Sequence, residues 1–141
     1  MSSKTDYFEN LLNDAIIRGN AAALAEIAAA AIGVGLFKSA LSESSVLASG
    51  ANEVTGSGYS RISAATFHAA FGTASSSGLV TNTTAISFGA FSSAPGTIYA
   101  VGWIDITTGK IWYYYNLASP ITPSTGSVVR YAAGALSFQE A

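Results

Sequence analysis

Few side chains in this sequence are of the types that carry out catalysis. His68 is the only histidine, there is no cysteine, and eight Asp and Glu residues are spread along the chain. A catalytic triad needs a base beside its nucleophile, and the sequence has no G-x-S-x-G turn to expose a serine. His68 stands in the strand-like run 66–70. The pattern therefore favours a structural or exposed strand histidine over a catalytic base.

The carboxylates form no recognisable acid–base or metal-binding pattern. A glycosidase needs two acids about 5 to 10 Å apart. After the first predicted helix the remaining carboxylates are dispersed over turns and the C-terminal tail: Glu26, Glu43, Glu53, Asp105 and Glu140. Zinc and calcium sites need several His, Cys or carboxylate ligands close together. The sequence therefore predicts no catalytic residue, no metal site and no cofactor.

A glycine-rich turn, N-E-V-T-G-S-G-Y-S-R-I over residues 52–62, is the most informative local pattern. A phosphate-binding loop would need Gly-Lys-Ser/Thr followed by a helix, whereas here a strand pattern follows. Gly56 and Gly58 therefore indicate a turn that needs positive φ or a close backbone approach. Glu53 and Arg61 flank this turn. We predict that they form an ion pair that closes it, with a contact between subunits as the alternative.

The candidate structural motif consists of Glu53, Gly56, Gly58, Tyr59 and Arg61. Its aromatic residue, Tyr59, follows the Gly-Ser-Gly step and is expected to start a strand with its ring buried.

Hydrophobic periodicity predicts one mainly β domain, residues 1–141, with a helical N-terminal region over 1–31. An amphipathic helix is expected over 6–18, capped by Asp6 and stopped by Gly19, with an Ala-rich, helix-permissive stretch over 20–31. Residues 32–141 are predicted to form an antiparallel β-sandwich. Its expected strands are 32–40, 58–70, 85–91, 97–106, 110–117 and 127–138.

The predicted hairpin 97–117, which turns at a left-handed Gly109, has no polar face. A half-buried antiparallel sheet normally alternates apolar and polar residues, so its second face needs a cover. The N-terminal helices or a neighbouring subunit could provide it, and aromatic residues are enriched at subunit interfaces. One short helix is too small to cover the whole aromatic face of the hairpin and the adjoining strands, so a neighbouring subunit is favoured as the cover. The candidate interface residues are Tyr99, Trp103, Trp112 and Tyr114.

The composition argues against nucleic-acid and membrane partners. Charged residues make up 10% of the chain, against about 25% in an average protein, and six Lys and Arg residues are scattered without a basic cluster. The most apolar run, 21–37, is mostly Ala and Gly and contains Glu26, whereas a membrane span needs roughly 20 apolar residues. The N-terminus shows no signal-peptide pattern, so we expect synthesis in a cytoplasm.

Several segments, in order along the chain, resemble a family of small tailed-bacteriophage virion proteins. That family reads approximately N/T-E-V-S-G-G-G-Y-A-R, which is similar to residues 52–61. The other similar segments are 16–19, 32–39, 82–88, 96–97, 105–109 and 133–136. The chain departs from the family in two turns, at 94–95 and at 125–127, where many relatives carry a Trp and a Gly-Asp pair.

The resemblance implies a non-enzymatic structural protein of a tailed-phage virion. Its expected partners are copies of itself, as a trimer, and the major capsid protein or other virion proteins. We prefer a capsid decoration (cement) protein, because the sequence lacks the long repetitive shaft segments of fibres. A tail or collar fibre component is the alternative. A carbohydrate-binding module, with Trp103, Trp112 and the tyrosines 113–115 as sugar platforms, is a weaker third possibility.

Overall fold

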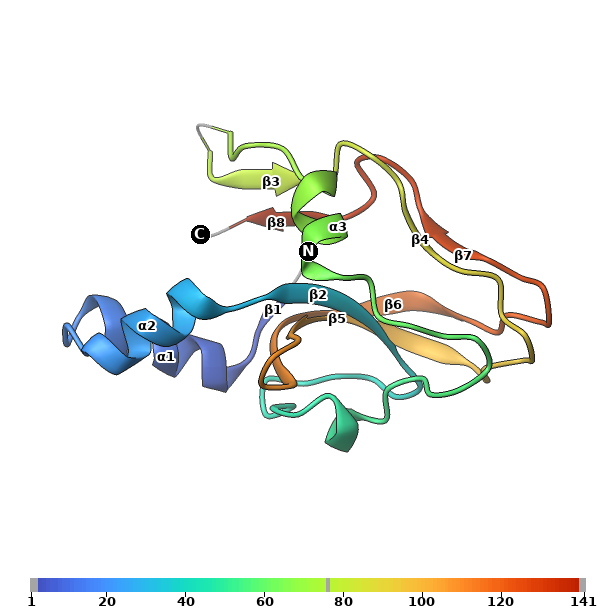
Figure 1. Ribbon diagram of the computed structural model, residues 1–141, viewed down its shortest axis with the longest axis horizontal. Helices are drawn as coiled ribbons and strands as arrows, with labels where there is room; N and C mark the ends of the chain where they lie inside the picture. Colours follow the sequence, from blue (N-terminus) through green and yellow to red (C-terminus); the bar gives the residue numbers. More distant parts are fainter. Residues whose placement is uncertain (1–2, 76, 140–141) are drawn as a thin grey trace.

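The computed structural model describes residues 3–75 and 77–139, and Figure 1 shows their arrangement. A four-stranded antiparallel sheet forms the centre, in the order β1 (Ser3–Lys4), β6 (Lys110–Ile121), β5 (Ile98–Asp105) and β2 (Ile32–Phe37). Two antiparallel two-stranded ribbons lie outside it. One pairs β3 (Leu79–Thr81) with β8 (Ser137–Gln139), and the other pairs β4 (Ile86–Phe88) with β7 (Val129–Tyr131). The helices are α1 (Asp6–Ile16), α2 (Ala21–Ala29) and α3 (Ala64–Ala70), with a 3-10 turn η1 (Ser49–Ala51).

The mainly β, antiparallel class with an N-terminal helix is therefore confirmed. In place of a second continuous sheet, the layer that faces β2 and β5 consists of α3 and the two ribbons (Figure 1). The hairpin turn between β5 and β6 forms as expected, with Gly109 at φ 72°.

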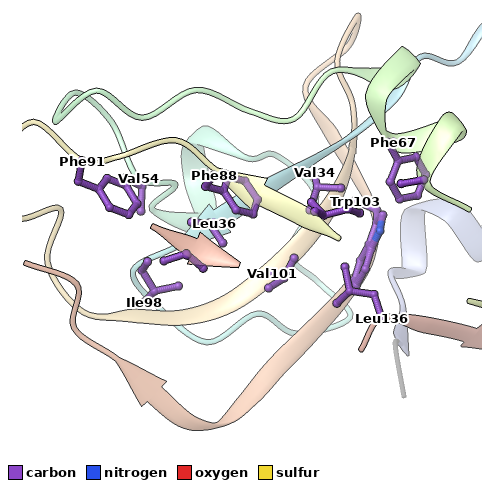
Figure 2. Close-up of a cluster of buried hydrophobic side chains, with 13 residues drawn as sticks. Val34, Leu36, Val54, Phe67, Phe88, Phe91, Ile98, Val101, Trp103 and Leu136 are labelled. Atoms are coloured by element: carbon purple, nitrogen blue, oxygen red, sulfur yellow. The ribbon is translucent and has the colours of Figure 1, made fainter. Parts of the chain in front are cut away.

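The largest hydrophobic core lies between the central sheet and this layer (Figure 2). The sheet contributes Val34, Leu36 and Trp103, which are at most 1% exposed, while α3 contributes Phe67 and β4 contributes Phe88. Burying such large apolar side chains is the main stabilising contribution to a fold of this size.

A second core fills the opposite face of the same sheet. It joins Phe37, Ile104 and Ile111 to residues of the segment between β2 and η1, including Leu41. The side-chain amide of Asn116 holds this segment, donating to the Leu41 carbonyl oxygen and accepting from the Leu41 N–H, each at 2.8 Å. The β5–β6 hairpin thus has two apolar faces because other parts of the chain cover both of them.

Helices α1 and α2 form an antiparallel hairpin that projects from the β body (Figure 1). A third core, of Phe8, Leu11, Ala15, Ala23 and Trp112, attaches it to β6. The N-cap of α1 is Thr5 and not the expected Asp6, because Thr5 Oγ1 accepts from the Phe8 N–H and also donates to the Ile111 carbonyl oxygen at 2.7 Å. Asn20 caps α2 in the same manner.

Two predicted strands were wrong. The expected strand 58–70 is an irregular segment followed by α3, in which Ser63 caps the helix and Phe67 and Ala70 face the core. Ala-rich sequence permits a helix here, and the apolar positions three residues apart fit one buried helical face. The expected strand 127–138 is divided into β7 and β8 by a turn in which Gly134 has φ 78°.

Asn82 joins the turn before β4 to the segment between β7 and β8. Its side chain, in a residue that is 1% exposed, donates to the carbonyl oxygens of Thr84 at 2.9 Å and Ala132 at 2.8 Å. It also accepts from the Leu136 N–H at 2.9 Å. One buried amide therefore satisfies three backbone groups that lie up to 54 residues away along the chain.

We expect Asn82→Ala to lower the free energy of unfolding by on the order of 3 kcal/mol, because it leaves buried backbone groups without partners. Urea unfolding followed by circular dichroism measures this change. Asn10→Ala, at an exposed position of α1, is the matched control and should be nearly neutral. Equal stability of the two variants would contradict this role for Asn82.

Candidate functional site

The predicted glycine-rich motif lies along the outer edge of β2. The Lys38 N–H donates to the Asn52 carbonyl oxygen, and the Val54 N–H donates to the Leu36 carbonyl oxygen, each at 2.9 Å. Further along the edge, Val34 and Ile62 exchange two backbone hydrogen bonds of 3.1 and 2.9 Å. Between these two contacts, residues 55–61 leave the edge as a loop. The backbone of this loop cannot pair with the middle of β2.

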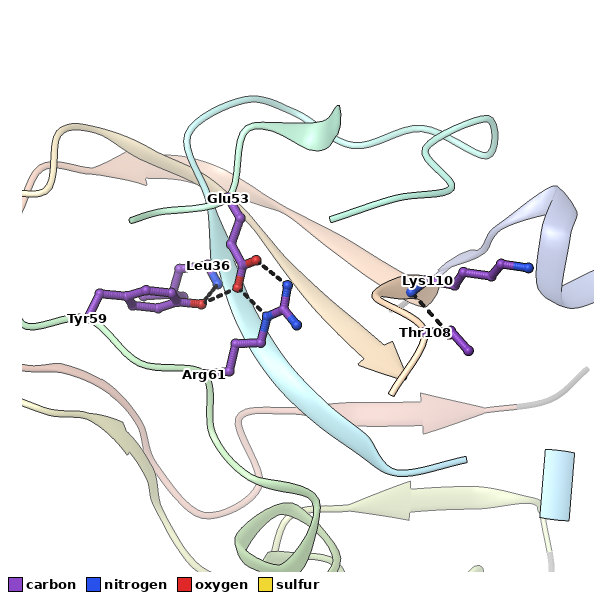
Figure 3. Close-up of polar contacts among 6 residues, drawn as sticks. All are labelled: Leu36, Glu53, Tyr59, Arg61, Thr108 and Lys110. Atoms are coloured by element: carbon purple, nitrogen blue, oxygen red, sulfur yellow. Dashed lines mark hydrogen bonds and ion pairs between the residues drawn. The ribbon is translucent and has the colours of Figure 1, made fainter. Parts of the chain in front are cut away.

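Side chains of the motif fill this gap (Figure 3). The Leu36 N–H donates to the hydroxyl oxygen of Tyr59 at 3.0 Å, and that hydroxyl donates to Glu53 Oε1 at 2.8 Å. Arg61 binds the same carboxylate through two nitrogens, with Nε 2.8 Å from Oε1 and Nη2 2.6 Å from Oε2. The predicted ion pair between Glu53 and Arg61 is confirmed, and it closes the turn within one chain.

The electrostatics of this cluster favour a neutral tyrosine beside an ionised pair. The Glu53 side chain is 9% exposed and the Arg61 side chain 29%. The hydrogen bonds to Glu53 raise the pKa of Arg61 above its ordinary value, although partial burial opposes this. Burial, followed by the negative charge of Glu53, raises the pKa of Tyr59 far above 10.0. Tyr59 therefore stays protonated at physiological pH, and its hydroxyl donates a hydrogen bond to Glu53.

The ring of Tyr59 is partly buried, as expected, and packs on the first core. It stacks on Phe88 with ring centroids 6.1 Å apart and an interplanar angle of 16°. Tyr59 does not start a strand, because the next regular element is α3. The residue thus joins the edge of β2 to the layer that covers the sheet.

Glycines on both sides of this contact allow the close approach. A Cβ atom on Gly35 would lie 2.8 Å from Glu53 Oε1 and 3.2 Å from the Tyr59 hydroxyl oxygen. A Cβ atom on Gly33 would clash with the Ile62 carbonyl oxygen. In the loop, Gly56 and Gly58 have φ of 66° and 72°, the left-handed region that glycine tolerates best.

The arrangement is a structural clamp. Both oxygens of Glu53 accept hydrogen bonds from Tyr59 or Arg61, so the carboxylate is fully used within the fold. His68, the other candidate for chemistry, is exposed on α3. Among residues 3–75 and 77–139 no group of three His, Cys, Asp or Glu side chains could hold a metal ion. Glu140 lies outside the described residues.

Two of the four predicted interface residues are buried in the hydrophobic cores of the chain itself. Trp103 is 1% exposed in the first core, and Trp112 is 5% exposed in the third. Their assignment to a subunit interface was therefore wrong, because segments remote in sequence cover the hairpin. Tyr114 is half-buried against the second core, and Tyr99 is exposed.

Asp105 is a structural residue whose contacts were not predicted from the sequence. It is 1% exposed, and its Oδ1 accepts from the N–H groups of Ala31 at 3.3 Å and Thr107 at 3.1 Å. Its Oδ2 accepts from Thr108 Oγ1 at 2.6 Å. The D-x-x-x-G spacing of the turn was the available signal, because Asp often bonds the backbone two residues on. The hydrogen bond from the Ala31 N–H could not be predicted from this local pattern, because Ala31 lies 74 residues away along the chain.

The sequence was compared with models of known protein families, and one family matches it. Residues 3–139 match the family model described as podophage GP4 fiber I protein gp80. This match confirms the resemblance to small tailed-phage virion proteins. No curated protein matches the sequence. No helix in the described part of the chain has the length and apolar character needed to cross a membrane.

We expect Gly35→Ala to lower the free energy of unfolding by about 1 to 3 kcal/mol, because the added methyl group would crowd Glu53 and Tyr59 and would also lie 2.7 Å from Ile104 Cδ1. Thermal and urea unfolding measure the loss. Gly50→Ala is the matched control, because a Cβ there meets nothing within 4 Å and its φ is not positive. A Gly35→Ala protein as stable as the control would show that the cluster does not need this close approach.

Proposed function

The chain belongs to the family described as podophage GP4 fiber I protein gp80, and from this membership we propose that it is a structural component of a phage virion fibre. The family match over residues 3–139 is the observation that carries this proposal. It favours the fibre alternative over the capsid decoration protein that we preferred from the sequence. A short anchoring or tip module of a fibre needs no repetitive shaft of its own.

The geometry supports a mechanical role. The buried polar residues among those described, Thr5, Asn82 and Asp105, each bond to backbone groups that join separate segments. The Glu53 carboxylate is likewise held by its neighbours. The carboxylates of Glu53 and Asp105 are therefore engaged in holding the fold, which is what a load-carrying virion protein requires.

The burial of the tryptophans argues against a carbohydrate-binding module. Sugar platforms are exposed aromatic faces, whereas Trp103 and Trp112 are covered by the chain itself. We therefore propose other virion proteins and further copies of this chain as its partners, with the fibre rather than the capsid shell as its location.

We expect the protein to be present in a low number of copies per particle, about a dozen or fewer, because fibres attach to the symmetric tail and not to every capsomer. Quantitative electrophoresis of purified virions measures this number, with the major capsid protein as internal standard. Antibodies against the protein should label the tail region in electron micrographs. Hundreds of copies with label over the capsid surface would refute the fibre proposal and restore the decoration protein.

A further inference from the structure

A pocket of about 430 Å³ lies where the first and third cores meet. Phe67 of α3 and Trp103 of β5 come from the first core and lie at the same end of it (Figure 2). Phe8 of α1 and Trp112 of β6 come from the third core, and Val80 of β3 completes the lining of one side. The volume falls within the range of about 300 to 1,000 Å³ that is usual for small-molecule sites.

The lining of this pocket is mostly aromatic and carries no formal charge. None of the described residues that line it is Asp, Glu, Lys or Arg. A charged group would lose its hydration there without gaining an opposite charge, which is costly. A sugar would bring several hydroxyl groups that need hydrogen-bond partners, and such a lining offers few. Aromatic rings instead pack well against the faces and edges of other rings. The lining therefore suits an uncharged ring compound.

The surroundings of the pocket favour a small molecule over the side chain of a protein partner. His68 and Gly72 line the pocket and are exposed, so they mark the side that opens to solvent. The residues that follow Gly72, at positions 73–75, are small or polar and exposed. The exposed large apolar side chains of the described residues lie elsewhere, because none of them lines the pocket. Protein interfaces usually surround a central pocket with further aromatic or apolar contacts.

We propose that this aromatic pocket, defined by Phe8, Phe67, Val80, Trp103 and Trp112, binds a small uncharged molecule that contains an aromatic ring system. The ring would lie against the aromatic side chains, and any polar end of the molecule would face the opening beside His68. Such a binding activity goes beyond the structural role proposed above. It is independent of where in the virion the protein is located.

Titration of the isolated full-length protein with N-phenylnaphthylamine, an uncharged aromatic probe, tests the proposal. Trp103 and Trp112 are the two tryptophans of the chain, and both line the pocket. The bound probe should therefore quench tryptophan fluorescence in a saturable manner and shift both indole N–H signals in a proton–nitrogen NMR spectrum. Because it binds the folded state, it should also raise the melting temperature.

A charged probe of the same shape tests the expected selectivity. Anilinonaphthalene sulfonate adds one negative charge to the ring system of N-phenylnaphthylamine, and it should bind at least about tenfold more weakly. Equal affinity for the two probes would overturn the proposal, since the uncharged lining would then not select the ligand. Indole signals that do not move while a probe binds would also overturn it, because the probe would then lie elsewhere.

A variant that fills the pocket tests its location. Val80→Phe adds volume to a side chain of the lining and should weaken binding of N-phenylnaphthylamine by at least about tenfold. Leu79→Phe is the matched control, because Leu79 precedes Val80 in β3, points to the other face of the ribbon and is not among the lining residues. It should keep the wild-type affinity. Circular dichroism verifies that both variants are folded. Undiminished binding by Val80→Phe, or no saturable binding by the wild-type protein, would refute the site.

Discussion

The closure of the outer edge of β2 is the contact on which the rest of the structure depends. An edge strand exposes unpaired N–H and C=O groups, and proteins that leave it open risk pairing with other chains. Here residues 52–54 and Ile62 pair with both ends of the edge, and the Tyr59 hydroxyl accepts from the Leu36 N–H between them. The Glu53–Arg61 pair fixes that hydroxyl, which can approach because Gly35 has no side chain.

This closure also determines how the two faces of the sheet are covered. The segment that leads into the motif carries the residues of the second core, and the segment that leaves it continues into α3, which covers the first. The hairpin of α1 and α2 packs on β6 through the third core, and its residues Ile16, Ile17 and Leu24 are exposed. The two most exposed large apolar side chains of the described residues, Ile16 and Ile17, therefore lie on this hairpin.

Local patterns in the sequence predicted α1, the β5–β6 hairpin and the Glu53–Arg61 pair, because each depends on residues at most about twenty positions apart. The strand expected over 58–70 was wrong because Ala-rich apolar sequence fits either periodicity, and the core that Phe67 enters is formed by distant segments. The same limit applies to Trp103 and Trp112, since the sequence does not reveal which part of the chain covers them. The bonds of Asn82 to residues 50 and 54 positions away left no local signal.

Hydrogen exchange at the Leu36 amide tests the edge closure most directly. If the Tyr59 hydroxyl accepts this N–H, Leu36 should be protected as strongly as its neighbours in β2 in the wild-type protein. In Tyr59→Phe the exchange of Leu36 should accelerate markedly, whereas the amides of Val34 and Lys38, which bond to backbone carbonyls, should keep their protection. Fast exchange of Leu36 in the wild-type protein, or an unchanged rate in Tyr59→Phe, would contradict the account.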